Sequence, residues 1–165
     1  MTTANETKLV AEPGSQMIIV EREFNAPREL VFEAYTTAEL FAEWMGPRDL
    51  KMDLKKFDAR DGGEWHYASS DNNGNSYESR GSFHEVTAPE RIIQTFEFLG
   101  MPQRGHVTLE TAVFQELPGG RTKVLMESVF RSVADRDGML QSGMEGGMND
   151  SFSRLNELLA KLQSK

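Results

Sequence analysis

The longest amphipathic pattern of the chain lies near its C-terminus, over residues 138–162. Apolar side chains recur there at steps of three and four residues, and this spacing places them on one stripe of a helix. An unbroken helix over this range would span roughly 37 Å, enough to cross a small domain. The stripe consists of Met144, Met148, Phe152, Leu155, Leu159 and Leu162. The pattern therefore predicts one long C-terminal helix.

The first half of this predicted helix combines glycines with methionines. Glycine lowers the stability of a helix by about 1 kcal/mol relative to alanine, whereas methionine is flexible and suits adaptable surfaces. The residues concerned are Met139, Gly143, Met144, Gly146, Gly147 and Met148. Two interpretations stay open at this point: loosely packed or frayed first turns, or the lid of a ligand cavity.

A strand and two short helices are predicted at the N-terminal end of the chain. Residues 16–24 alternate so that Ile18, Val20, Arg22 and Phe24 share one face of the strand. Pro27 suits the first turn of a helix, where no amide donor is needed, and this helix is expected to reach about residue 36. A capping-box pattern over residues 36–39 starts the second helix.

Six further strands are predicted between these helices and the C-terminal helix. Their expected ranges are 50–55, 64–70, 77–86, 91–99, 107–115 and 122–131. Asn73-Gly74 is a strong hairpin pattern, and counting outward from it places Trp65 and Phe83 on the inner face of the sheet.

The face of residues 107–115 depends on the turn that follows. We expect the inner residues of this strand to be Val107, Leu109, Thr111 and Val113. A shift of one residue in the turn would reverse the two faces.

The order of elements predicts an α+β fold. Sequential, hairpin-linked strands favour an antiparallel sheet, and a sheet of about six to seven twisted strands tends to curl. Such a sheet, wrapped on a long C-terminal helix, leaves space between the two. The predicted domain covers residues 16–165, and the polar residues 1–15 are expected to form a mobile, disordered tail.

Composition excludes several classes of function. The formal net charge of −8 argues against nucleic acid or an anionic membrane as a main partner. The chain has no cysteine, so disulfides and thiolate chemistry are absent. No apolar run reaches the about 18 residues that span a bilayer, and the N-terminus lacks the apolar segment of a signal peptide. A cytoplasmic location is therefore expected.

The histidines are the first candidates for acid–base or metal chemistry. His66 and His84 fall on the predicted outer face, and His106 has no evident partner. A metal site needs further ligands at defined geometry, and only Glu64 lies near in the sequence pattern. Neither a Gly-x-Ser-x-Gly elbow nor a phosphate-binding loop is present. We therefore expect no metal, no cofactor and no catalytic residue.

The predicted inner face is a better candidate for a binding site. Ligand pockets are usually apolar with a few placed polar groups, and this face combines aromatic residues with an arginine, a glutamine and a serine. The candidate ligand-binding residues are Arg22, Trp65, Tyr67, Phe83, Gln94, Phe96, Phe98, Met126, Ser128, Phe130, Met144, Met148 and Phe152. The alternative is a purely structural role, with the aromatic residues as core and Arg22 in an ion pair.

Several short motifs, taken in order, resemble a known family. They are Arg22-Glu23-Phe24-Asn25-Ala26-Pro27, Trp44-Met45-Gly46-Pro47, Gly62-Gly63-Glu64-Trp65, Gly81-Ser82-Phe83-His84-Glu85-Val86, Pro89-Glu90-Arg91-Ile92, Gly119-Gly120-Arg121-Thr122-Lys123-Val124 and Gly143-Met144-Glu145-Gly146-Gly147-Met148. This order is similar to the AHSA-like family, the bacterial homologues of the activator of the heat-shock-90 ATPase. That family belongs to the SRPBCC superfamily of START and birch-pollen-allergen-like domains. The resemblance implies a helix-grip fold with a groove for apolar or amphipathic molecules.

Three hypotheses of function follow. The first is a cytoplasmic binding module, monomer or homodimer, for a small apolar or aromatic ligand. The second, implied by the eukaryotic namesake, is a co-chaperone-like interaction module of a stress response, whose partner is a chaperone. Its surface would be the outer charges Glu64, Arg80, Glu97, Lys123 and Glu127.

The third hypothesis is an enzyme of the cyclase or hydrolase kind found among the relatives, and it ranks last. It needs a titratable group inside the groove with a perturbed pKa. Only Arg22 and Glu110 could point inward.

Overall fold

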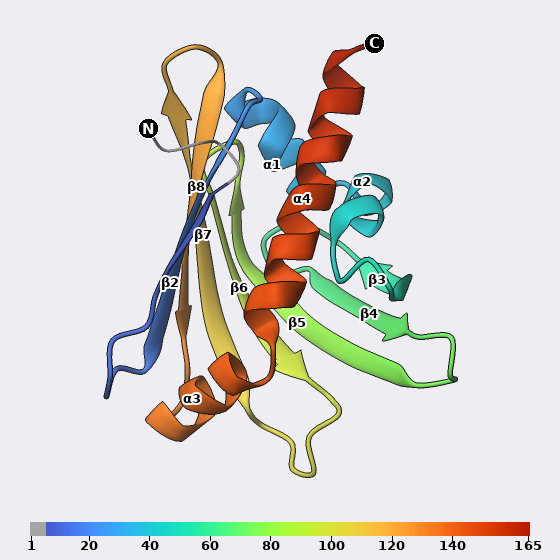
Figure 1. The fold of residues 1–165 in the computed structure, drawn as a ribbon, viewed down its shortest axis with the longest axis vertical. Helices are drawn as coiled ribbons and strands as arrows, with labels where there is room; N and C mark the ends of the chain where they lie inside the picture. The colour runs from blue at the N-terminus through green and yellow to red at the C-terminus, as the bar shows by residue number, and fades with distance from the viewer. Residues whose placement is uncertain (1–5) are drawn as a thin grey trace.

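The computed structural model describes residues 6–165 of the protein (Figure 1). The elements in chain order are β1 (Thr7–Val10), β2 (Met17–Phe24), α1 (Arg28–Thr36), α2 (Ala38–Trp44), β3 (Lys51–Phe57), β4 (Glu64–Ser70), β5 (Ser76–Thr87), β6 (Arg91–Phe98), β7 (Val107–Leu117), β8 (Arg121–Val129), α3 (Val133–Gln141) and α4 (Met144–Gln163).

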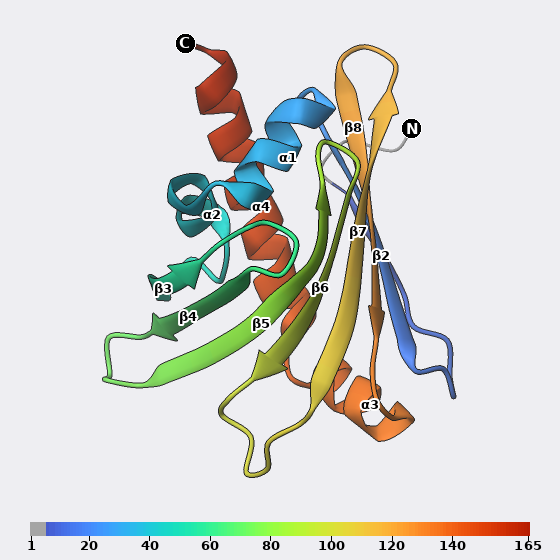
Figure 2. The same ribbon diagram turned by 180° about the vertical axis from the view of Figure 1, so that it is seen from behind.

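The strands form one antiparallel sheet of eight strands in the order β1-β2-β8-β7-β6-β5-β4-β3. The helix α4 crosses one face of this twisted sheet, and α1 and α2 lie beside its upper half (Figure 1). Seen from behind, the opposite face of the sheet carries no helix (Figure 2). The predicted α+β helix-grip architecture is confirmed, with one strand more than the six to seven expected. No helix within residues 6–165 is long and apolar enough to cross a membrane.

The additional strand is β1, which pairs antiparallel with β2 so that Thr7 lies opposite Arg22. The tail predicted over residues 1–15 therefore does not hold for Thr7–Val10, whereas residues 1–5 lie outside the described residues. Four residues show too little alternation to identify a strand, and this one depends on pairing with β2. One side-chain bond reinforces the pairing, because the Arg22 guanidinium donates to Thr7 Oγ1 over 2.6 Å.

The single helix predicted over residues 138–162 is wrong at its N-terminal end. The chain forms α3, turns at Ser142 and Gly143, and then begins α4. Gly143 has a left-handed backbone with φ of 85°, a conformation that glycine adopts readily and that cannot continue a right-handed helix. Ser132 caps α3 by accepting a hydrogen bond from the backbone N–H of Asp135 over 3.0 Å.

The predicted inner face of β7 is also wrong. Leu109 is 47% exposed, whereas Thr108 and Phe114 are 4% and 1% exposed. Leu117 pairs with Arg121 across a turn of three residues, 118–120. An odd number of turn residues shifts the count by one and reverses the two faces. The inner residues of β7 are therefore Thr108, Glu110, Ala112 and Phe114.

The helices α1 and α2 are anchored by buried side chains. Trp44 Nε1 donates to the Ala34 carbonyl over 2.9 Å, which fixes α2 against α1. Thr122 on β8 donates its hydroxyl to the Ala26 carbonyl over 2.7 Å, just before α1. Both helices occur where the sequence predicts them, but Thr37 at the start of α2 makes no side-chain capping bond. The predicted capping box is therefore not formed.

Candidate functional site

A pocket of about 440 Å³ lies between the inner face of the sheet, the N-terminal half of α4 and the end of α2. Its walls are mostly apolar, from aromatic, aliphatic and methionine side chains. They include Ile18, Val20, Phe41, Trp44, Phe57, Trp65, Tyr67, Phe83, Ile92, Phe96, Met126, Met144, Met148 and Phe152. A volume of this size falls in the range typical of small-molecule sites.

Three aromatic rings form one continuous part of the wall. The ring of Trp65 stacks on that of Tyr67, with centroids 5.5 Å apart and planes at 22°. Its centroid also lies 5.8 Å from that of Phe96, with planes at 31°. Trp65 and Tyr67 lie two residues apart on β4, and Phe96 lies on β6, which is separated from β4 only by β5.

The helix α4 closes the pocket and is tied to the end of α2. Ser151 Oγ accepts a hydrogen bond from the backbone N–H of Gly46 over 2.8 Å. The Arg154 guanidinium donates to the carbonyls of Gly46 over 3.0 Å and Glu43 over 2.7 Å. These bonds fix the part of α4 that follows the glycines, so Met144 and Met148 lie on a helix of defined position.

The polar part of the pocket is centred on Glu110. Glu110 lies between Gln94 of β6 and Ser128 of β8 in the register of the sheet. Gln94 Nε2 donates to Glu110 Oε1 over 3.0 Å. Burial raises the pKa of Glu110, and the bond from Gln94 opposes this only in part. Burial therefore disfavours the ionised form of this carboxyl group relative to its form in water.

Two half-buried tyrosines lie at the same end of the pocket. Burial raises the pKa of both Tyr35 and Tyr67, and the negative charge of Glu110 raises each of them further. Tyr67 bonds to Ser79. The hydroxyl of Tyr35 and Nε1 of Trp65 are buried without a hydrogen-bond partner among the described residues. The pocket therefore combines an apolar wall with unsatisfied polar atoms close to it.

Most of the ligand-binding residues predicted from the sequence line this pocket; their role in binding stays a prediction. Those brought together are Trp65, Tyr67, Phe83, Gln94, Phe96, Met126, Ser128, Met144, Met148 and Phe152. Arg22, Phe98 and Phe130 do not line it.

Local packing explains these exceptions. The Phe98 ring covers Gly100 at the end of β6, and Phe130, just past β8, is 6% exposed. Arg22 lies over the rings of Phe24 and Phe152, 5.8 and 5.5 Å from their centroids. Within residues 6–165 Arg22 forms no ion pair, so the structural alternative for it is wrong in that respect. Burial lowers its pKa.

The predicted ligand-binding residues do not include two polar residues of the pocket, Glu110 and Tyr35. The inner face expected for β7 excluded Glu110 because of the turn before β8, although Glu110 was named as a group that could point inward. Tyr35 lies among the apolar residues of α1, and a helical pattern does not distinguish a core tyrosine from a pocket tyrosine. The third hypothesis, an enzyme, required a titratable group in the groove, and Glu110 is such a group.

The histidines lie elsewhere. His66 Nε2 is 3.1 Å from Glu78 Oε2. His106 has a partner after all, because its Nδ1 lies 3.1 Å from both carboxylate oxygens of Asp135 on α3. No group of three or more histidine, aspartate or glutamate side chains could hold a metal ion in the part of the chain that the structure describes.

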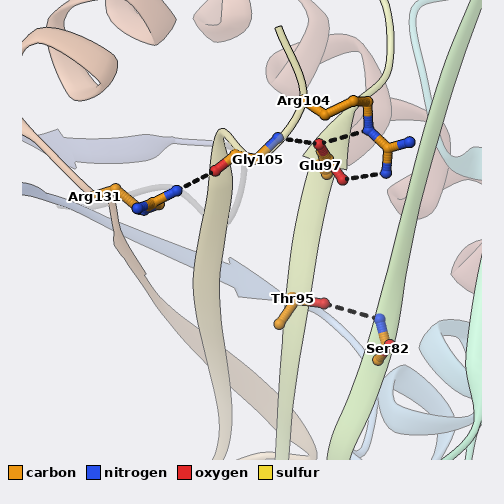
Figure 3. Close-up of polar contacts among 6 residues, drawn as sticks. All are labelled: Ser82, Thr95, Glu97, Arg104, Gly105 and Arg131. Atoms are coloured by element: carbon orange, nitrogen blue, oxygen red, sulfur yellow. Dashed lines mark hydrogen bonds and ion pairs between the residues drawn. The ribbon is translucent and has the colours of Figure 1, made fainter.

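Glu97, one of the outer charges of the co-chaperone hypothesis, is occupied within the chain (Figure 3). It accepts two hydrogen bonds from Arg104, over 3.1 and 3.0 Å, and one from the Gly105 N–H over 2.7 Å. These bonds lower the pKa of Glu97 to about 2. Arg131 donates to the Gly105 carbonyl over 2.8 Å, so the loop between β6 and β7 is held at two points.

The comparison with protein families identifies the fold. The model of the family described as Activator of Hsp90 ATPase homolog 1-like protein matches residues 25–160. The chain belongs to this family. The resemblance inferred from the sequence motifs is therefore confirmed. No curated protein matches the chain.

Solved structures show the same fold. A Rhodobacter sphaeroides protein has a TM-score of 0.83 at 24% identity, covering 95% of this chain and 99% of its own. A Staphylococcus epidermidis protein has a TM-score of 0.79 at 29% identity, covering 91% and 93%. The AHSA1 protein from Silicibacter pomeroyi has a TM-score of 0.72 at 22% identity, covering 87% and 97%. At these identities the first and the third show the fold alone.

Proposed function

We propose that the protein is a binding module that holds a small apolar or aromatic molecule between the sheet and α4. The observation that supports this proposal is the pocket of about 440 Å³ with its largely apolar wall. Protein interiors are normally packed without voids of this size, because unfilled apolar volume lowers the free energy of unfolding. A molecule that filled the pocket would recover these lost contacts.

The wall and the lid would make different contributions to binding. The rings of Trp65, Tyr67 and Phe96 offer flat surfaces on which a planar or cyclic group can stack. Met144 and Met148 on α4 have flexible, polarizable side chains that can adapt to ligands of different outline. The pocket therefore suits a rigid apolar group better than a polar one. The cytoplasmic location stays a prediction from the sequence.

A neutral dye tests this proposal without reference to any charged group. N-phenyl-1-naphthylamine fluoresces more strongly in apolar surroundings, so its fluorescence should rise when the protein is added. Ala112 lines the pocket from β7, and Ala112→Phe should fill the pocket and abolish the rise. Val113→Phe adds the same group to the neighbouring residue on the opposite face of that strand and should retain the rise.

Circular dichroism on both variants checks that the fold is kept. Equal dye binding by Ala112→Phe and the wild type, or no binding by the wild type, would contradict the proposal.

A chaperone-binding module remains the second candidate, because the family description refers to an activator of the Hsp90 ATPase. Two of its expected contact charges are engaged within the chain: Glu97 with Arg104, and Glu64 with Lys56 over 2.5 Å. Recovery of purified Hsp90 by the immobilised protein, lost on reversal of the charge of Lys123, would support this candidate. No recovery at low ionic strength would count against it.

A further inference from the structure

We propose that the ligand of the pocket carries a protonated amine and that the carboxylate of Glu110 is its counter-ion. This inference rests on the proposed function and names the chemical class of the molecule bound. It follows from the charges of the pocket, from the partners of Glu110 and from the rings nearby.

The first observation is the sign of the charge in the pocket. None of the side chains that line it is lysine, arginine or histidine. The acidic residues that line it are Glu110 and Glu127. Glu127 is an exposed residue of β8, next to the inward-facing Met126 and Ser128, so its side chain lies on the outer face. The ionisable group of the inner wall is therefore Glu110, whose charged form is negative.

The second observation is that Glu110 has spare capacity for hydrogen bonds. A carboxylate accepts about four hydrogen bonds, and Glu110 receives one from Gln94 at Oε1. Its Oε2 makes no hydrogen bond or ion pair with residues 6–165. Glu110 is half-buried, and a carboxylate at the wall of an apolar pocket without a cationic partner is unfavourable. A protonated amine in the pocket would supply both the opposite charge and the missing donors.

The third observation is the aromatic surroundings of Glu110. Its charge acts on both Tyr35 and Tyr67, and Tyr67 stacks on Trp65. An ammonium group beside Glu110 would therefore lie in a pocket lined by aromatic residues, and aromatic rings attract cations. The acidic protein as a whole also draws cations toward it.

The same geometry disfavours an anionic ligand. A carboxylate or phosphate group in the pocket would face Glu110 without a cation on the wall to compensate for it. Arg22 is the buried cation closest in the sheet, but its guanidinium bonds Thr7 and lies over Phe24 and Phe152, and it does not line the pocket.

Three probes with the same apolar body separate the possibilities: 1-naphthylmethylamine, 1-naphthalenemethanol and 1-naphthoate. Their dissociation constants are measured by calorimetry, and their position by amide-resolved NMR. We expect the amine to bind about tenfold or more tightly than the alcohol, since charge-assisted bonds are about twice as strong as neutral ones. The carboxylate should bind most weakly.

The matched variants are Glu110→Gln and Glu116→Gln, which remove the same charge from the same strand. Glu116 is exposed near the end of β7. Glu110→Gln should lower the affinity for the amine by about tenfold and leave that for the alcohol nearly unchanged. Glu116→Gln should leave both unchanged. A glutamine can still bond Gln94, and thermal unfolding of each variant checks that the fold is retained.

The pH dependence gives a second measurement. The protonated amine binds ionised Glu110 more tightly than neutral Glu110. The affinity of the protein for the amine should therefore rise with pH and level off once Glu110 is ionised in the free protein. Gln94, Ser128, Tyr35 and Tyr67 face Glu110 from β6, β8, α1 and β4, and Met144, Met148 and Phe152 line the pocket from α4. None of these titrates between about pH 5 and about pH 8. Glu110→Gln should therefore abolish the dependence.

The outcomes separate this inference from the function on which it rests. Equal binding of the amine and the alcohol in the pocket, or tighter binding of the carboxylate, would overturn the proposal that the ligand carries an amine. The proposal of a binding module would still stand. If none of the three probes shifts the NMR signals of pocket residues, the amine proposal is also overturned. The fluorescence experiment with the neutral dye then tests the binding module independently.

Discussion

Trp65 lies flat over Gly81, its cross-strand partner in the β4–β5 hairpin. A Cβ added at Gly81 would be 2.6 Å from Cε2 of the indole and 1.9 Å from the Thr95 carbonyl oxygen. Only a residue without a side chain therefore allows the indole to lie against the sheet and the neighbouring strand to approach. This pair sets the position of the aromatic wall of the pocket.

We predict that Gly81→Ala destabilises the protein and displaces Trp65. Overpacking of this kind costs about 1–3 kcal/mol of the free energy of unfolding, measured by urea denaturation, and the tryptophan fluorescence should shift. Gly146→Ala is the matched control, because a Cβ there meets nothing within 4 Å. In a helix this change should stabilise by about 1 kcal/mol. A neutral Gly81→Ala would show that the indole does not need the glycine.

The network of Glu97 predicts a loss of stability in acid. A group with a lowered pKa stabilises the fold above its ordinary pKa, and this contribution is lost as the pH falls through the folded-state value. For Glu97 the window runs from the ordinary value of 4.5 down to about 2. Glu97→Gln should cost about 1–3 kcal/mol at neutral pH and should flatten the acid limb of a plot of stability against pH.

The control for this experiment is Glu116→Gln, which removes an exposed carboxylate that forms no ion pair within residues 6–165. It should keep the acid limb of the wild type. Faster amide exchange at residues 99–106 in Glu97→Gln would connect the lost stability to the loop between β6 and β7 that Glu97 holds. An unchanged acid limb in Glu97→Gln would contradict the prediction.

The break between α3 and α4 predicts different effects of two substitutions at Gly143. Its φ of 85° is strained for alanine and tolerated by asparagine. Gly143→Ala should lower the free energy of unfolding by about 1–2 kcal/mol, whereas Gly143→Asn should lower it by less. Denaturation curves of the two variants measure the difference. Equal effects would mean that the left-handed backbone is not the cause of the break.

The faces of the strands could be predicted only where the residues of the connecting turn define its length. Asn73-Gly74 fixes the faces of β4 and β5, and the predicted pocket positions of Trp65, Tyr67 and Phe83 are correct. The turn before β8 contains Pro118, Gly119 and Gly120, and their composition does not reveal whether two or three residues remain unpaired. That ambiguity reversed the inner face expected for β7 and left the orientation of Glu110 undecided.

Two further features depend on tertiary contacts. β1 is a four-residue strand that is stabilised by its pairing with β2. The turn at Gly143 lies inside a hydrophobic pattern that continues through it, so the helical periodicity alone predicts no break there. In both cases the local pattern permits more than one structure, and packing against the sheet selects among them.

Arg22 allows a test of whether a buried charge stabilises this fold. It is 3% exposed, has no carboxylate partner among residues 6–165, and packs on two aromatic rings. A buried charge is often replaced by an apolar side chain of similar size without loss of stability. We therefore expect Arg22→Met to stay within about 1 kcal/mol of the wild type, or to exceed it.

Arg22→Ala is the matched comparison, because it removes the same charge and also the packing of the long side chain. It should cost about 2–4 kcal/mol through the cavity that it leaves. Urea denaturation of both variants, each combined with Thr7→Val to remove the orphaned hydroxyl, measures the two contributions separately. If Arg22→Met is as unstable as Arg22→Ala, then the attraction between the guanidinium and the rings of Phe24 and Phe152 outweighs the cost of burying the charge.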